Sequence, residues 1–165
     1  MLSMTNHFSS EDHFMMEEAF LEAEKAFDKE EVPVGAVLSF EGKIIARSHN
    51  QMETRGDPTA HAEILCIREG AEVMGNWRLL GSVLYTTLEP CVMCAGALLL
   101  ARVHKVIWAA PDKRHGAHGS FVDLFDKKHP THKLEIEGGL FESRSAHLMR
   151  HFFKKRRIKH EKDRS

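Results

Sequence analysis

One short stretch constrains the fold more than any other: TLEPCVMCAG, residues 87–96, which holds two of the three cysteines of the chain. Cys91 and Cys94 follow directly behind Pro90, and proline is favoured in the first turn of a helix. Residues at positions i and i+3 of a helix share a face, so both thiols can bind one zinc ion. They can equally form a redox pair at a helix N-terminus or be two small buried side chains. Only further ligands elsewhere in the chain separate a metal site from these alternatives.

A second segment, GDPTAHAEIL at residues 56–65, supplies such ligands. Asp57-Pro58 can cap and open a helix there, so two helix N-termini can point at one place. Residues i and i+2 of a regular helix face nearly opposite sides, so we expect His61 to bind the metal and Glu63 to lie beside its water. With the two cysteines this makes three protein ligands. An open fourth position is typical of a catalytic zinc rather than a structural one.

In the rest of the chain, the pattern of apolar residues predicts a first helix, a hairpin of two strands, and then helices alternating with strands. We expect helices from Ser9 or Ser10 to about Phe27, over about 59–74, over 90–102 and over about 142–160. The expected strands are VGAVLSF and KIIARSHN around a Glu41-Gly42 turn, residues 82–88, KVIWAA and KLEIEG. A long loop, roughly residues 111–131, lies between the last two strands. This order predicts one domain over residues 1–165, a three-layer α/β/α fold with a mixed sheet.

Composition excludes several other classes of protein. The chain is 42% hydrophobic and 28% charged, as expected for a soluble globular domain. Its longest apolar run, Val92–Ala101, is far shorter than the roughly 20 residues that span a bilayer. The first residues lack the basic start and apolar stretch of a secretory signal. We therefore expect no membrane partner, no disulfide framework and a cytoplasmic location.

Charge is distributed unevenly along the chain. Residues 1–31 carry nine acidic residues against two lysines, whereas residues 150–165 carry eight Lys and Arg against two acidic residues. A basic terminal segment is a candidate surface for a polyanion, although a solvated helix end would have the same composition.

The ordered set of motifs resembles the bacterial tRNA adenosine deaminases of the TadA type. His-x-Glu followed by Pro-Cys-x-x-Cys is the signature of zinc nucleoside deaminases, which include cytosine, cytidine and guanine deaminases. Further blocks occur in the order of the tRNA family over residues 30–157: VPVGAVL, HN with GDPTAHAEI, LYTTLEPCVMCAGA, Asp112 with GAHGS, and FFKKRR.

The resemblance implies a cytidine deaminase-like fold with a five-stranded sheet, and hydrolytic deamination of adenosine to inosine at the wobble position of the tRNA anticodon. It implies one zinc ion per subunit, bound by His61, Cys91 and Cys94, with Glu63 as the proton shuttle for the zinc-activated water. It also implies a homodimer without a nucleotide cofactor. The resemblance implies that the nucleoside is contacted by Asn50 and Asp112. It implies that the anticodon stem-loop is contacted by Lys154, Lys155, Arg156 and Arg157.

Two alternatives to this function stay open at this point. A zinc deaminase of a free nucleobase or nucleoside, such as cytosine or guanine, has the same short motif, but it needs no basic helix. A zinc-stabilised RNA-binding module without catalysis gives no reason for Glu63 or for an open ligand position.

Other suggestive residues have simpler interpretations. We expect Cys66 to be a packing residue rather than a fourth ligand. We expect Phe152 and Phe153 to pack the terminal helix onto the body, with the alternative that one of them faces a base. The loop histidines carry no acidic or thiol partner at regular spacing, so we expect solvent exposure or RNA contact instead of a second metal site. They are His115, His118, His129 and His132.

Overall fold

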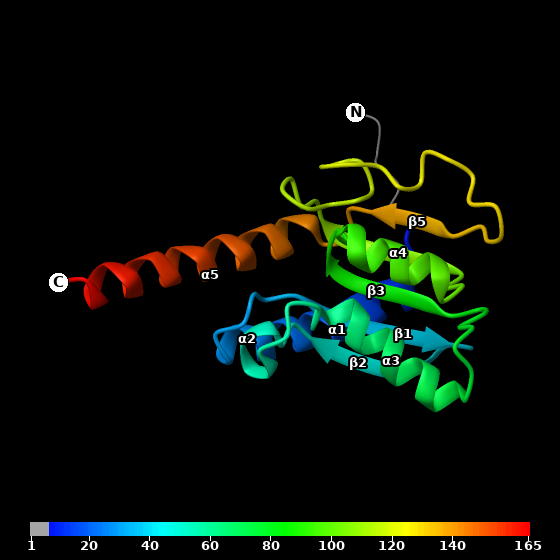
Figure 1. Ribbon diagram of the computed structural model, residues 1–165, viewed down its shortest axis with the longest axis horizontal. Helices are drawn as coiled ribbons and strands as arrows, with labels where there is room; N and C mark the ends of the chain where they lie inside the picture. The colour runs from blue at the N-terminus through cyan, green and yellow to red at the C-terminus, as the bar shows by residue number, and fades with distance from the viewer. Residues whose placement is uncertain (1–6) are drawn as a thin grey trace.

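A mixed five-stranded sheet forms the centre of the protein, which is described here for residues 7–165 of a computed structural model (Figure 1). Its strands are β1 (Gly35–Phe40), β2 (Lys43–His49), β3 (Val83–Leu88), β4 (Lys105–Ala110) and β5 (Glu135–Gly138). They lie in the order β2-β1-β3-β4-β5. Strand β1 is antiparallel to both of its neighbours, whereas β3, β4 and β5 are parallel to one another. The mixed sheet expected from the sequence is confirmed.

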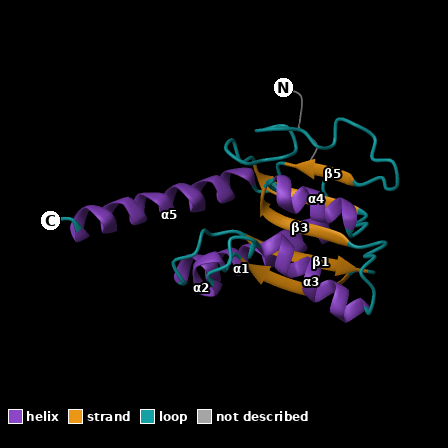
Figure 2. Cartoon of the chain, viewed as in Figure 1, coloured by secondary structure: helices purple, strands orange, loops and turns teal. Residues whose placement is uncertain are grey.

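Helices cover both faces of this sheet. Residues 7–165 form α1 (Ser10–Asp28), α2 (Met52–Arg55), α3 (Ala62–Met74), α4 (Val92–Leu100) and α5 (Glu142–Asp163). Helices α3 and α4 lie side by side on one face, and α1 covers the other (Figure 2). The strands allow this because their side chains alternate: Leu38 and Leu84 pack with the α3 side, and Val37 and Tyr85 pack with α1. The three-layer arrangement is therefore confirmed.

Local signals fix the first elements. The side chain of Ser9 accepts a hydrogen bond from the Asp12 N–H, and the Asp12 carboxylate accepts one from the Ser9 N–H, a capping box that begins α1. The β1–β2 hairpin turns at Glu41 and Gly42, which both have positive φ, 49° and 75°. Two such residues match the twist of a hairpin, as the sequence predicts.

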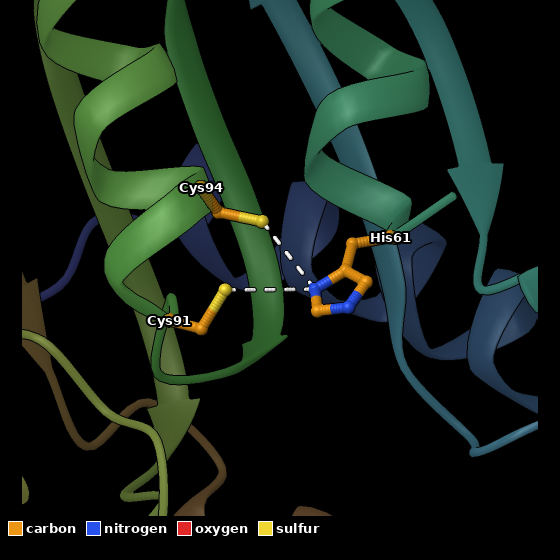
Figure 3. A group of neighbouring side chains, drawn as sticks. All are labelled: His61, Cys91 and Cys94. Atoms are coloured by element: carbon orange, nitrogen blue, oxygen red, sulfur yellow. Dashed lines mark hydrogen bonds between the residues drawn. The ribbon is translucent and has the colours of Figure 1, made fainter. Parts of the chain in front are cut away.

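The starts of two helices differ from the expectation. Helix α3 begins at Ala62 instead of about residue 59, and α4 begins at Val92 instead of residue 90. The reason is that His61 and Cys91 have extended backbones, with ψ of 149° and 174°, and serve as N-caps. Both side chains therefore lie at helix ends and point toward each other (Figure 3).

The C-terminal helix α5 packs on the body at its start and then projects away from the sheet (Figure 1). Its Leu148 packs against the α1 side of the core, and Phe152 is buried at 5% exposure. Between β4 and β5, residues 111–134 form a long loop without helices or strands. In residues 7–165 no helix has both the length and the apolar character needed to cross a membrane.

Candidate active site

A cavity of about 1080 Å³ opens where the N-terminal ends of α3 and α4 meet the long loop and α5. Seven of the residues predicted from the sequence line it: Asn50, His61, Glu63, Cys91, Asp112, Lys154 and Arg157. Cys94 lies behind this lining and is buried. The two cations Lys155 and Arg156 are not part of the lining.

His61, Cys91 and Cys94 converge in one cluster, although they come from two helix ends (Figure 3). The Nδ1 atom of His61 lies 3.6 Å from the Sγ of Cys91 and 3.6 Å from the Sγ of Cys94. All three ligand atoms lie within 4.8 Å of one another. In the described part of the chain, this is the one group of three or more His, Cys, Asp and Glu side chains that could hold a metal ion.

The spacing of the cluster fits zinc. A tetrahedral zinc, about 2.3 Å from sulfur and about 2.0–2.1 Å from nitrogen, sets a sulfur and a nitrogen ligand about 3.6 Å apart. Both observed nitrogen–sulfur separations are 3.6 Å. Two thiols and one imidazole are also the ligand types that zinc prefers in a catalytic site with an open fourth position. The zinc cofactor expected from the sequence agrees with this geometry.

Electrostatics prepare the cluster for a cation. The hydrogen bond with Cys94 lowers the pKa of Cys91 to about 4, and His61 acts in the same direction. Hydrogen bonding to Cys91 and burial raise the pKa of Cys94. A lowered pKa of Cys91 favours the thiolate, which is the form of cysteine that binds a metal ion.

Glu63 lies next to the cluster in the second residue of α3. Its side chain is 4% exposed, and burial raises its pKa. The Thr86 hydroxyl donates a hydrogen bond to Oε1 at 3.1 Å, and the Cys94 thiol lies 3.5 Å from Oε2. Because His61 stands outside the helix as its N-cap, its side chain and that of Glu63 both reach the cavity. The carboxyl group is therefore held where it can exchange a proton.

Asn50 and Asp112 reach the cavity in different ways. The Asn50 Oδ1 accepts the Ala62 N–H at 2.9 Å, so its amide nitrogen is the donor left for a ligand. The Asp112 Oδ1 accepts the N–H groups of Arg114 and His115, at 3.1 and 3.3 Å, and so closes a turn at the cavity rim. Asn50 is thus the more direct candidate for contact with a base.

The basic residues of α5 divide between two faces of the helix. Arg150, Lys154 and Arg157 recur at helical spacing and line the cavity, together with Phe153. On the other face, the Arg156 guanidinium pairs with Glu53 at 3.4 Å. Lys155 lies over the ring of Phe27, 5.2 Å from its centroid.

The sequence prediction did not single out Arg150, and it left open that one of Phe152 and Phe153 faces a base. The spacing of residues 150, 153, 154 and 157 indicates that they share one face of the helix. The spacing does not indicate that this face meets the cavity. Phe152 packs as expected, whereas Phe153 is 37% exposed and lines the cavity.

The loop histidines do not form a second metal site among the described residues. His115 lines the active-site cavity, and His129 and His132 line a separate, smaller cavity. His118 differs from the expectation of solvent or RNA contact because its Nδ1 accepts a hydrogen bond from the Trp108 indole at 3.0 Å. Cys66 is fully buried and donates to the Ala36 carbonyl, which confirms a packing role.

Comparison with known proteins agrees with this geometry. Residues 9–110 match the family described as the cytidine and deoxycytidylate deaminase zinc-binding region. The fold and the His-Cys-Cys cluster therefore define a zinc-binding deaminase with the cytidine deaminase-like fold.

Individual relatives narrow this class. The tRNA-specific adenosine deaminase of Bacillus subtilis (strain 168) is 45% identical over 150 residues, covering 91% of this chain and 93% of that protein. The chloroplastic tRNA(adenine(34)) deaminase of Arabidopsis thaliana is 48% identical over 161 residues, but this chain spans only 12% of its length. A solved structure from a study of A-to-I editing by tRNA:A34 deaminases at the wobble position has 44% identity and a TM-score of 0.78, covering 82% of this chain and 98% of that chain. The chain belongs to the tRNA-specific adenosine deaminase family.

Proposed function

We propose that the protein converts adenosine to inosine at the wobble position of a tRNA anticodon. One observation carries this proposal: a single cavity is lined both by His61, Glu63 and Cys91 and by a row of cations from α5. A free nucleobase needs no phosphate-binding surface, so cations that line the reaction cavity favour a nucleic acid substrate. Relatives named for the same reaction support it.

His61, Cys91 and Cys94 would hold the zinc ion. Zinc supplies one chemical effect when bound, which is to lower the pKa of a coordinated water from about 15.7 toward 7. Glu63 accepts the proton of the attacking water and delivers protons to the ring nitrogen and to the departing amine. Oxygen is added at carbon 6 of adenine, ammonia leaves, and the base becomes hypoxanthine. Thr86 holds the Glu63 carboxyl group in place through its hydrogen bond to Oε1.

The substrate base must leave its stack to reach Glu63, because a base paired within a duplex cannot enter an enclosed reaction site. An anticodon loop offers such an unpaired base. Asn50 can then donate from its amide nitrogen to the nucleoside. Arg150, Lys154 and Arg157 can bind the flanking phosphates, which adds affinity without sequence choice.

The proposed oligomeric state rests on the resemblance, and the proposed location rests on the composition of the chain and on its substrate. We propose a homodimer that acts in the cytoplasm, since the family generally forms dimers and its tRNA substrate is found there. These two points do not affect the assignment of the reaction.

The deciding assay uses the zinc-loaded protein with a tRNA that carries adenosine at the wobble position. The controls are the same tRNA with guanosine at that position, and free adenosine, cytosine and guanine. We expect inosine only in the first tRNA. Deamination of a free base without any reaction on tRNA would favour the nucleobase deaminase instead, and a protein that binds tRNA but never forms inosine would be a zinc-stabilised binding module.

A further inference from the structure

Glu89 is a buried acid that the mechanism does not use. It lies at the end of β3, directly before Pro90 and the ligand Cys91, and its side chain is 1% exposed. Charged side chains are rarely buried without partners, because loss of hydration destabilises them strongly. The partners of this carboxylate therefore indicate what it does.

Four groups of one loop donate hydrogen bonds to Glu89. Its Oε1 accepts the Asp112 N–H at 3.2 Å and the Ser120 hydroxyl. Its Oε2 accepts the His118 N–H at 2.9 Å and the Ser120 N–H at 3.3 Å. All four donors come from residues 112–120, which we call the rim loop. One carboxylate thus replaces the hydrogen bonds that regular secondary structure supplies elsewhere.

The rim loop is also attached to the backbone around Cys91. The Ala117 N–H donates to the Pro90 carbonyl at 2.8 Å, and Gly116 forms a β-bridge with Cys91. Gly116 is required here because a Cβ atom at this position would lie 2.3 Å from the Cδ of Glu89. Gly116 therefore packs directly against the Glu89 carboxylate on one side and pairs with the backbone of Cys91 on the other.

The rim loop supplies part of the cavity wall. Lys113, Arg114 and His115 line the same cavity as the basic face of α5. These side chains belong to a segment without helix or strand, so their positions depend on what anchors the loop. The main buried anchor is the Glu89 carboxylate.

We propose that Glu89 is a positioning residue, which fixes the rim loop as a substrate-binding wall beside the metal ligands. The proposal rests on the proposed function, because the substrate that this wall meets is the anticodon loop. Glu89 does not itself touch the substrate. It acts through Lys113, Arg114 and His115, which it holds in place for binding rather than for the chemical step.

Glu89→Gln tests this role with almost no change in volume. A carboxylate offers two acceptor oxygens, whereas an amide offers one oxygen and one NH₂ group. Oε2 faces two backbone N–H groups, and Oε1 faces one N–H group and the Ser120 hydroxyl, which can also accept. Either orientation of the glutamine therefore sets its NH₂ against at least one N–H donor. We expect the rim loop to detach from its anchor while the His-Cys-Cys cluster keeps its zinc.

The first measurement is amide hydrogen exchange of the zinc-loaded protein, which needs no substrate. In Glu89→Gln, exchange should become faster in residues 112–120 and stay unchanged in α3 and β1. Glu22→Gln is the matched control, because Glu22 is also a buried carboxylate but accepts from Lys25 and His49, away from the rim loop. The control should leave exchange in residues 112–120 unchanged. Unchanged exchange in Glu89→Gln would overturn the proposal.

The second measurement separates positioning from stability. With tRNA as substrate, Glu89→Gln should raise KM about 10- to 100-fold and change kcat much less. Loss of kcat with an unchanged KM, or loss of zinc, would contradict a positioning role through the rim loop. If the wild-type protein does not react with tRNA, the proposed function is wrong. The hydrogen exchange experiment still tests separately whether Glu89 anchors residues 112–120.

A milder variant covers the case in which Glu89→Gln does not fold. Ser120→Ala removes one of the four donors and leaves the carboxylate intact. It should show the same pattern, with faster exchange in residues 112–120 and a smaller rise in KM. A variant that loses the Ser120 hydroxyl without any change in exchange or KM would count against the proposal.

Discussion

His61 and Cys91 are the N-caps of two neighbouring helices, and their Nδ1 and Sγ atoms lie 3.6 Å apart across 30 residues of sequence. Each helix end therefore contributes both a ligand and the partial positive charge of its N-terminus, which favours thiolate in the cluster. A metal ion held by this pair would link α3 and α4 directly.

Loss of a ligand should therefore cost zinc and stability together. We expect Cys91→Ser to bind zinc more than about 100-fold more weakly and to unfold at a lower temperature, because metal binding contributes to folding. Zinc content by elemental analysis and a thermal unfolding curve measure both effects. Cys66→Ser is the matched control: it changes a buried thiol outside the cluster, and a serine hydroxyl can still donate to the Ala36 carbonyl. Zinc loss in that control would contradict the ligand assignment.

Glu63 should be needed for turnover and not for the metal. We expect Glu63→Ala to keep stoichiometric zinc and to lower kcat by about 10²- to 10⁴-fold, the usual range for a lost general acid–base group. Inosine formation per bound zinc is the measurement. A near-normal rate would remove Glu63 from the role of proton shuttle.

The two faces of α5 should differ in their contribution to tRNA binding. We expect Lys154→Ala with Arg157→Ala to weaken binding and to reduce its logarithmic dependence on salt by about 2, roughly 1 for each lost phosphate contact. Lys155→Ala with Arg156→Ala removes the same net charge from the face that meets Phe27 and Glu53. Equal effects of the two double variants would mean that only the charge of α5 matters.

Glu22 should make folding sensitive to acid. Burial raises its pKa, but the hydrogen bonds from Lys25 and His49 outweigh this effect and lower the pKa below its ordinary value of 4.5. A carboxyl group with a lowered folded-state pKa stabilises the protein above the unfolded value, and this contribution is lost as the pH falls through the folded value. The melting temperature should therefore decrease more steeply below about pH 4.5 in wild type than in Glu22→Gln. If the melting temperatures of wild type and Glu22→Gln fall in parallel with pH, Glu22 contributes nothing to the pH dependence of stability.

The chemistry of the site was predictable because it depends on residue types at short spacing. Cys91, Cys94 and His61 would hold a metal through atoms close to their own backbones, so the helix ends that place them are visible in the sequence as Pro90 and Asp57-Pro58. Even there, the helices begin a few residues later than expected, since His61 and Cys91 have extended backbones and serve as N-caps.

The walls of the cavity were less predictable. Glu89 looks like part of a helix start, and nothing near it in sequence indicates that its partners lie in residues 112–120, more than 20 residues later. Likewise, four adjacent cations on α5 look equivalent until packing against Phe27 and Glu53 divides them. Long-range contacts decide both cases, and local patterns do not contain them.

The order of these parts along the chain has a consequence for synthesis. The three metal-binding side chains lie between residues 61 and 94, whereas α5 begins only at Glu142. As the ribosome extends the chain from its N-terminus, every zinc ligand is present well before the basic wall of the cavity. On the proposed function, the residues for metal binding and those for RNA binding emerge at different times, and a nascent chain that stalls before α5 carries all three proposed zinc ligands but lacks the basic wall of the cavity.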